Sequence, residues 1–113
     1  MEEKGWDEAR KILEGLGYRV GQMSRTTRTP YPYDLIAEKG GEHLLIEVKY
    51  AEDNHESAGF YFRWSRRAYQ ELKKKAVSEG WKSRVLLIAR DGDQVNYLFL
   101  EPHFAEPWFK LDV

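Results

Sequence analysis

The sequence predicts an α/β sandwich, in which a central mixed β-sheet is flanked by helices on both faces. Two segments, at about residues 3–16 and 65–79, repeat apolar side chains at three- and four-residue spacing, as amphipathic helices do. Short apolar and aromatic runs bounded by turn residues predict strands between and after these helices. The order helix, strand, strand, strand, helix, strand, strand is typical of layered α/β domains.

The first half of the chain predicts a helix, a short strand and a long polar loop. The helix is expected over about residues 3–16 and ends at a pair of glycines, the second of which is Gly17. A short strand is expected at Tyr18–Gln22. The polar stretch Met23–Tyr31, which is rich in Thr and Arg, is expected to be a loop.

Two hairpins are predicted on either side of the second helix. The first joins Tyr33–Glu38 to His43–Tyr50 through a Gly-Gly turn, and the second joins Ser83–Arg90 to Gln94–Leu100 through Asp-Gly-Asp. A brief extended piece is expected at Phe60–Phe62.

The second helix is expected to begin after the N-cap Ser65 and to run to about Glu79. Its predicted buried face consists of Tyr69, Leu72, Ala76 and Val77. The remaining chain, from Glu101, carries Phe104 and Trp108 and is expected to pack over the domain.

Length and composition restrict the classes of protein to which the chain can belong. With 113 residues, 42% hydrophobic and 33% charged, it is expected to fold as one domain, residues 1–113. The absence of cysteine excludes disulfides, thiol catalysis and iron–sulfur clusters. No apolar run approaches the roughly 20 residues that span a bilayer, and the acidic N-terminus is unlike a leader. We therefore expect a cytoplasmic protein without a membrane partner.

Basic residues are concentrated in two regions, although the net charge is only −1. Residues 16–33 carry +3 and residues 62–75 carry +5, and salt screening makes such local clusters decide attraction to phosphates. We expect the arginines of both regions to contact nucleic-acid phosphates; they are Arg25, Arg28, Arg63, Arg66 and Arg67. The lysine run 73–75 fits a solvated helix face equally well.

Charged side chains interrupt the apolar strands of the first hairpin. Strand alternation places Glu47 and Lys49 on one face. Asp34 lies six residues before Gly40 and Glu47 lies six residues after Gly41, so the two carboxylates can sit opposite each other. Two close carboxylates repel unless a cation joins them. The sequence therefore predicts a metal site at this hairpin.

The expected metal is Mg²⁺ or Mn²⁺, because hard divalent cations prefer oxygen ligands. Its ligands would be Asp34, Glu47 and the backbone carbonyl of Val48. Lys49 would orient or deprotonate an attacking water and stabilise charge on phosphate. The implied reaction is hydrolysis of a phosphodiester. No glycine-rich loop opens a helix, so no nucleotide cofactor is expected.

These residues resemble the signature of the PD-(D/E)xK nuclease superfamily. Pro32-Tyr33-Asp34 followed by Glu47-Val48-Lys49 carries the resemblance, with one extra tyrosine between the proline and the aspartate. The Ile-Glu-Val-Lys stretch and a first helix ending in Leu-Gly-Tyr are similar to archaeal Holliday-junction resolvases and Mrr-like endonucleases. The resemblance implies a restriction-endonuclease-like fold, a metal held by Asp34 and Glu47, and Lys49 as the catalytic lysine.

The resemblance also implies an acidic residue on the first helix. The position expected near Trp6 is not acidic, so Glu8, Glu2 or Asp7 would substitute, and Glu8 is the preferred candidate. A solvated surface glutamate is the alternative. Related resolvases pair, and so small a domain offers little surface for a duplex, so a homodimer is expected.

The predicted function is therefore that of a metal-dependent DNA endonuclease, with branched DNA as one possible substrate class. Two other classes remain open. One is a non-catalytic nucleic-acid-binding module on the same fold. The other is a protein-interaction domain that docks through the segment Phe104–Trp108.

Overall fold

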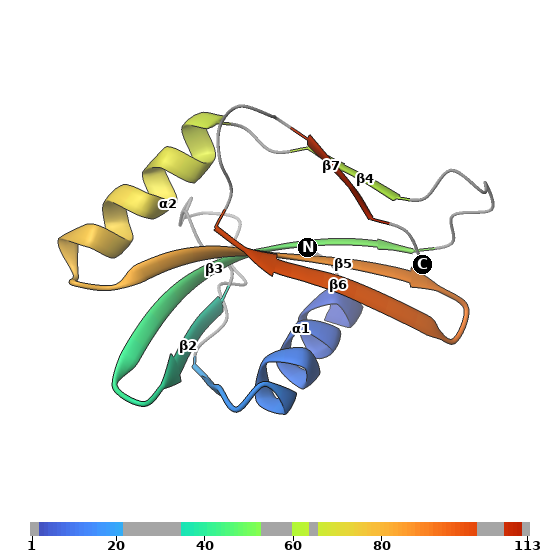
Figure 1. Cartoon of the computed structure of the whole chain (residues 1–113), viewed down its shortest axis with the longest axis horizontal. Coiled ribbons are helices and arrows are strands. Elements are labelled where there is room, and N and C mark those ends of the chain that lie inside the picture. The colour runs from blue at the N-terminus through green and yellow to red at the C-terminus, as the bar shows by residue number, and fades with distance from the viewer. Residues whose placement is uncertain (1–2, 22–34, 53–59, 64–65, 102–107, 112–113) are drawn as a thin grey trace.

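The computed structural model describes residues 3–21, 35–52, 60–63, 66–101 and 108–111. They form two helices and seven strands, shown in Figure 1. In chain order these are α1 (Glu3–Gly15), β1 (Arg19–Val20), β2 (Leu35–Lys39), β3 (Glu42–Glu52), β4 (Phe60–Arg63), α2 (Arg66–Ser78), β5 (Lys82–Asp91), β6 (Gln94–Leu100) and β7 (Trp108–Leu111).

Five strands make the central sheet, in the order β1-β2-β3-β5-β6. The pair β3 and β5 is parallel, and the other neighbours are antiparallel, so the sheet is mixed as predicted. Two neighbouring parallel strands need a long crossover connection, and α2 lies within the connection from β3 to β5. The crossover places α2 on one face of the sheet, while α1 lies against the other (Figure 1).

Each face of the sheet has its own apolar core. The core under α1 contains Ala9, Leu13, Leu35, Ala37, Leu44, Ile46, Val48, Leu86 and Ile88. The core under α2 contains Leu45, Tyr69, Leu72, Ala76, Val85, Leu87 and Ala89. Within these cores, the even-numbered residues of β3 and β5 therefore face α1 and the odd-numbered residues face α2, as strand alternation requires.

The first hairpin turns as its Gly-Gly pair predicts. Gly40 and Gly41 have φ of 59° and 84°, the left-handed conformation that a tight hairpin turn needs and that glycine adopts without strain. Lys39 pairs with Glu42 directly across this turn, and the register continues to Leu35 opposite Ile46. The turn therefore fixes which residues of β2 and β3 lie side by side.

Two features of the structure differ from the sequence prediction. First, β7 pairs antiparallel with β4 in a separate two-stranded sheet, and no strand was predicted at residues 108–111. Second, Val77 was predicted to be buried, but its side chain is 66% exposed. The residues of α2 that face the sheet are Tyr69, Leu72 and Ala76. The predicted N-cap Ser65 and Phe104 lie outside the described residues. Neither described helix is long and apolar enough to cross a membrane.

Candidate active site

Glu47 and Lys49 lie on the α2 face of β3, two residues apart. The Nζ atom of Lys49 is 3.5 Å from Oε1 of Glu47, and the two side chains are 34% and 17% exposed. The prediction that they share one face is confirmed, since both alternate with residues of the α1-side core. The structure therefore brings a carboxylate and an ammonium group together at a half-buried position in the central strand.

The neighbouring strand makes this position apolar. Glu47 pairs with Val85 and Lys49 pairs with Leu87, and both of these β5 residues are fully buried. One carboxylate oxygen of Glu47, Oε2, is itself buried. A charged carboxylate in such surroundings is costly unless a cation lies near it, and Lys49 supplies one. The pair has the low-dielectric environment in which charges act strongly on a bound substrate.

A buried hydroxyl pair lies next to this site, beneath α2. The Tyr69 hydroxyl lies 3.2 Å from Oγ of Ser83, and the two residues are 1% and 4% exposed. Burial raises the pKa of Tyr69, and the negative charges of Glu101 and Glu47 add to the rise. Tyr69 therefore stays a neutral hydroxyl on the same face as Glu47. The helical periodicity predicted that Tyr69 is buried, but no pattern in the sequence predicted its contact with Ser83.

Val48 and Asp34 complete the predicted metal ligands. The Val48 side chain is 4% exposed and packs in the α1-side core, so the prediction uses only its backbone carbonyl. Asp34 lies outside the described residues. The last described pair of the hairpin joins Leu35 to Ile46, the residues adjacent in sequence to Asp34 and Glu47.

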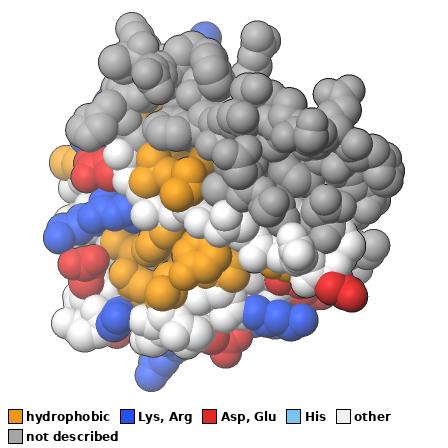
Figure 2. Space-filling view, turned by 45° about the vertical axis from the view of Figure 1, so that its right-hand side comes forward, with side chains coloured by type: hydrophobic (Ala, Val, Ile, Leu, Met, Phe, Trp, Pro, Cys, Tyr) orange, Lys and Arg blue, Asp and Glu red, His pale blue; other side chains and the backbone are white. Residues whose placement is uncertain are grey.

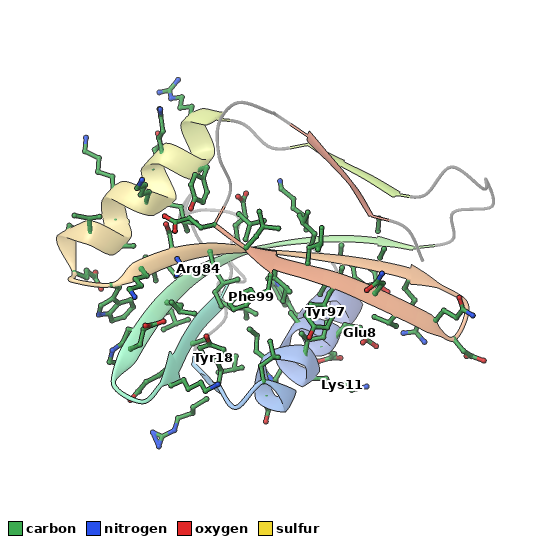
Figure 3. All side chains as sticks on the ribbon, viewed as in Figure 1. Glu8, Lys11, Tyr18, Arg84, Tyr97 and Phe99 are labelled. Carbon is green, nitrogen blue, oxygen red and sulfur yellow. The ribbon has the colours of Figure 1, made fainter. Side chains whose placement is uncertain are left out.

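The carboxylate of Glu8 lies on the other face of the sheet. Oε1 of Glu8 is 3.2 Å from a guanidinium nitrogen of Arg90, and the glutamate side chain is 16% exposed. Arg90 alternates with residues of the α1-side core, and Figure 3 labels Glu8 on α1, away from α2. The structure does not bring Glu8 together with Glu47 and Lys49. It is not a solvated surface glutamate either, because it is largely covered and paired.

The arginines predicted to bind phosphate are described only in part. Arg25 and Arg28 lie outside the described residues. Arg63 ends β4 and Arg66 begins α2, and only their backbone is described. Arg67 is 88% exposed and lies 3.6 Å from Glu71, one turn further along α2. Its position on the α2 side leaves it accessible to a partner on that side of the molecule.

The donor set around Glu47 fits a hard divalent cation. The Glu47 carboxylate and the Val48 backbone carbonyl offer oxygen, which Mg²⁺ and Mn²⁺ prefer over softer donors. Among the side chains that the structure describes, no three His, Asp or Glu residues gather as a metal site. The described part of the chain thus contributes Glu47 as its single carboxylate to the predicted site.

Comparison with known proteins supports the fold. No family model and no curated protein matches this chain. Among solved structures, it is similar to the 1.6 Å structure of Hjc, a Holliday junction resolvase from the archaeal hyperthermophile Archaeoglobus fulgidus. The TM-score is 0.66 and the sequence identity is 20%, over 98% of this chain and 88% of that chain. The predicted three-layer α/β fold is confirmed, and it is the fold of this resolvase.

Proposed function

We propose that this protein is a metal-dependent DNA endonuclease that hydrolyses phosphodiester bonds. The observation that carries the proposal is the Glu47–Lys49 pair, half-buried at 3.5 Å on the central strand. Support comes from the fold, since a structural neighbour is a Holliday junction resolvase. The sequence resembles the same group of nucleases at these residues, and we therefore propose branched DNA as the first substrate class to test.

The mechanism assigns one task to each residue. Glu47, Asp34 and the carbonyl of Val48 would hold Mg²⁺ or Mn²⁺. When bound, such an ion neutralises phosphate charge and lowers the pKa of a water molecule. Lys49 donates a hydrogen bond to the attacking water or to a phosphate oxygen, and its charge stabilises the pentacovalent transition state. The apolar neighbours Val85 and Leu87 exclude water from one side, which strengthens these interactions.

The same proposal includes the expected partners and location. DNA would be bound by the arginines of the predicted loop and of α2, and residues 1–113 would act as one domain in the cytoplasm.

A homodimer would use the edge strand β6, whose residues Gln94–Leu100 carry no charge. Val95, Tyr97 and Leu98 of β6 are among the exposed large hydrophobic residues, and hydrophobic side chains gather on the face shown in Figure 2. Sedimentation velocity measures this association.

The decisive experiment incubates the protein with branched, duplex and single-stranded DNA in Mg²⁺, Mn²⁺ or EDTA. We expect cleavage of at least one substrate with metal and none with EDTA. Lys49→Ala should abolish cleavage and leave DNA binding nearly unchanged. Lys11→Ala is the matched control, because Lys11 is an exposed lysine of α1 (Figure 3).

Two results would contradict the proposal. Salt-sensitive DNA binding with no products in either metal would instead support a non-catalytic binding module on this fold. Full cleavage by Lys49→Ala would remove Lys49 from the mechanism.

A further inference from the structure

A hollow opens between the end of α2 and the beginning of β5, and the proposed mechanism does not use it. Its volume is about 260 Å³. The residues that line it are Lys73, Ala76, Val77, Trp81, Lys82, Ser83, Arg84 and Glu101. This volume lies just below the roughly 300–1,000 Å³ of pockets for drug-sized ligands, so the hollow suits one small chemical unit.

The backbone between α2 and β5 holds the walls of the hollow in place. Gly80 has φ of 74°, and the Trp81 amide donates a 2.8 Å hydrogen bond to the Ala76 carbonyl. This reversal ends the helix and leads directly into β5. The Trp81 ring stacks on His43 of β3, with centroids 5.0 Å apart and an interplanar angle of 18°. The tryptophan that lines the hollow is therefore fixed from two sides.

The hollow carries more positive than negative charge. Lys73, Lys82 and Arg84 line it together with the acid Glu101, and the Lys82 ammonium also donates a 3.1 Å hydrogen bond to Glu42 of β3. The acid is a weak counter-charge, since it lies 3.7 Å from Arg84 and its side chain is 52% exposed. Arg84, which lines the hollow, is 24% exposed and donates a 2.6 Å hydrogen bond to the carbonyl of Ser83, another lining residue. A fixed guanidinium beside two ammonium groups favours an anion, above all phosphate.

An apolar strip borders these cations. Val77 is 66% exposed, although it lies on the same helix as the buried Tyr69, Leu72 and Ala76. Trp81 adds an aromatic wall. Exposed apolar surface next to concentrated positive charge fits a ligand that is anionic at one end and ring-bearing at the other. A nucleotide has this combination of phosphate, sugar and base.

We infer that the hollow binds one phosphate-bearing nucleotide unit. The phosphate lies against Lys73, Lys82 and Arg84, and the sugar or base covers Val77 and Trp81. The unit comes either from a nucleic-acid strand or from a free mononucleotide, which share this chemistry. Figure 3 labels Arg84 near the beginning of β5, on the strand that pairs with β3.

The position of the hollow connects it to the candidate active site. Ser83 pairs with Leu45 and Val85 pairs with Glu47, so the two places are separated by two residues along parallel strands. At about 3.3 Å per residue this is roughly 7 Å, a distance that one nucleotide can span. In the nuclease the hollow would hold a nucleotide next to the bond that is cleaved. This connection rests on the proposed function, whereas the binding itself does not.

Binding is tested without cleavage, on the Glu47→Gln protein in EDTA. The probes are a short single-stranded oligonucleotide with a 5′-phosphate, the same strand with a 5′-hydroxyl, a 5′-mononucleotide and its nucleoside. We expect each phosphorylated probe that binds to shift the NMR signals of the Trp81 indole and the Val77 amide. Binding of the mononucleotide alone would identify a free ligand, and binding of the oligonucleotide alone would identify a strand; both support the inference.

The matched variants are Lys73→Ala and Lys74→Ala. These exposed lysines are neighbours on α2, but only Lys73 lines the hollow. Lys73→Ala should weaken binding of the phosphorylated probe three- to tenfold, and Lys74→Ala should change it less than twofold. Equal losses in both variants, or equal binding of phosphorylated and unphosphorylated probes, would overturn the inference. Because metal is absent, such a failure leaves the nuclease proposal standing, and a failure of cleavage leaves this binding testable.

Discussion

The two faces of the central sheet are built from the same strands but differ in chemistry. In the middle of β3, the residues that face α1 are Leu44, Ile46 and Val48, and all three are apolar and buried. The residues that alternate with them toward α2 include Glu47 and Lys49, which are charged and partly exposed. The ion pair of Glu8 with Arg90 lies on the α1 face toward the end of β5, whereas the pair of Glu47 with Lys49 lies on the α2 face in the middle of β3.

Both faces contribute an apolar core, and we propose that the α2 face additionally carries the chemistry. Burying apolar side chains under α1 holds the sheet together. The charges under α2 reduce the apolar area available for burial, so a role in function is the simplest reason for them to be there. The comparison can be tested at single positions of β3, because neighbouring residues lie on different faces.

The largest expected effect is on cleavage and follows from Glu47→Gln. The amide keeps the shape of the side chain but loses the charge that would hold the metal, so cleavage should fall by roughly 10³-fold, about 4 kcal/mol of activation free energy. The thermal midpoint should change little. Initial rates on the best DNA substrate and thermal melting measure the two quantities.

The control for this variant is Glu38→Gln on β2. Glu38 is also a strand glutamate, lies 3.5 Å from His43, and has a side chain that is 42% exposed. It should cleave at the wild-type rate. Equal losses of activity in both variants would show that the position of the carboxylate on the α2 face of β3 is unimportant.

The next effect is on stability and follows from Ile46→Ala, one residue away. Ile46 is fully buried in the α1-side core, so the variant should lose about 3 kcal/mol of unfolding free energy through lost burial and a residual cavity. Urea unfolding measures this loss. Cleavage per folded molecule should stay near wild type at low temperature, and a specific loss of cleavage would show that the two faces are not separate.

Local sequence patterns predicted much of the difference between the two faces of the sheet. Alternation alone assigned Glu47 and Lys49 to one face, and the Gly-Gly turn set the register that pairs Leu35 with Ile46. Both follow from interactions within a few residues. The existence and type of α1, α2 and the strands β2, β3, β5 and β6 were predicted correctly for the same reason.

Features that depend on distant segments were not predictable in this way. The pairing of β7 with β4 joins residues about fifty positions apart. The sequence pattern of neither segment predicts which strand it pairs with. The contact between Tyr69 and Ser83 and the ion pair between Glu8 and Arg90 arise only when helices dock on the sheet. The placement of Glu8 on the α1 face is such a tertiary result, and the roles of Asp34 and of the loop arginines stay predictions.

The Glu8–Arg90 pair gives a third, smaller test of the comparison. If Glu8 serves stability, Glu8→Gln should cost about 1 kcal/mol of unfolding free energy, because both partners are only partly covered. Cleavage should stay within threefold of wild type. A loss of cleavage beyond a hundredfold with unchanged stability would place Glu8 in the catalytic machinery, as the superfamily resemblance implies, and would end the division between the faces.

The smallest effect concerns Tyr69, the buried hydroxyl of the α2 face. Burial raises its pKa above the ordinary value of 10, so the folded state holds this proton more tightly than the unfolded state. The resulting stability is complete below pH 10 and is lost as the pH rises toward the folded-state pKa. Tyr69→Phe should cost about 1 kcal/mol at neutral pH through the lost bond to Ser83, and its unfolding free energy should then fall less steeply above pH 10. Urea midpoints of both proteins between pH 8 and 11 measure this, and parallel curves would mean that the hydroxyl is not held neutral by its surroundings.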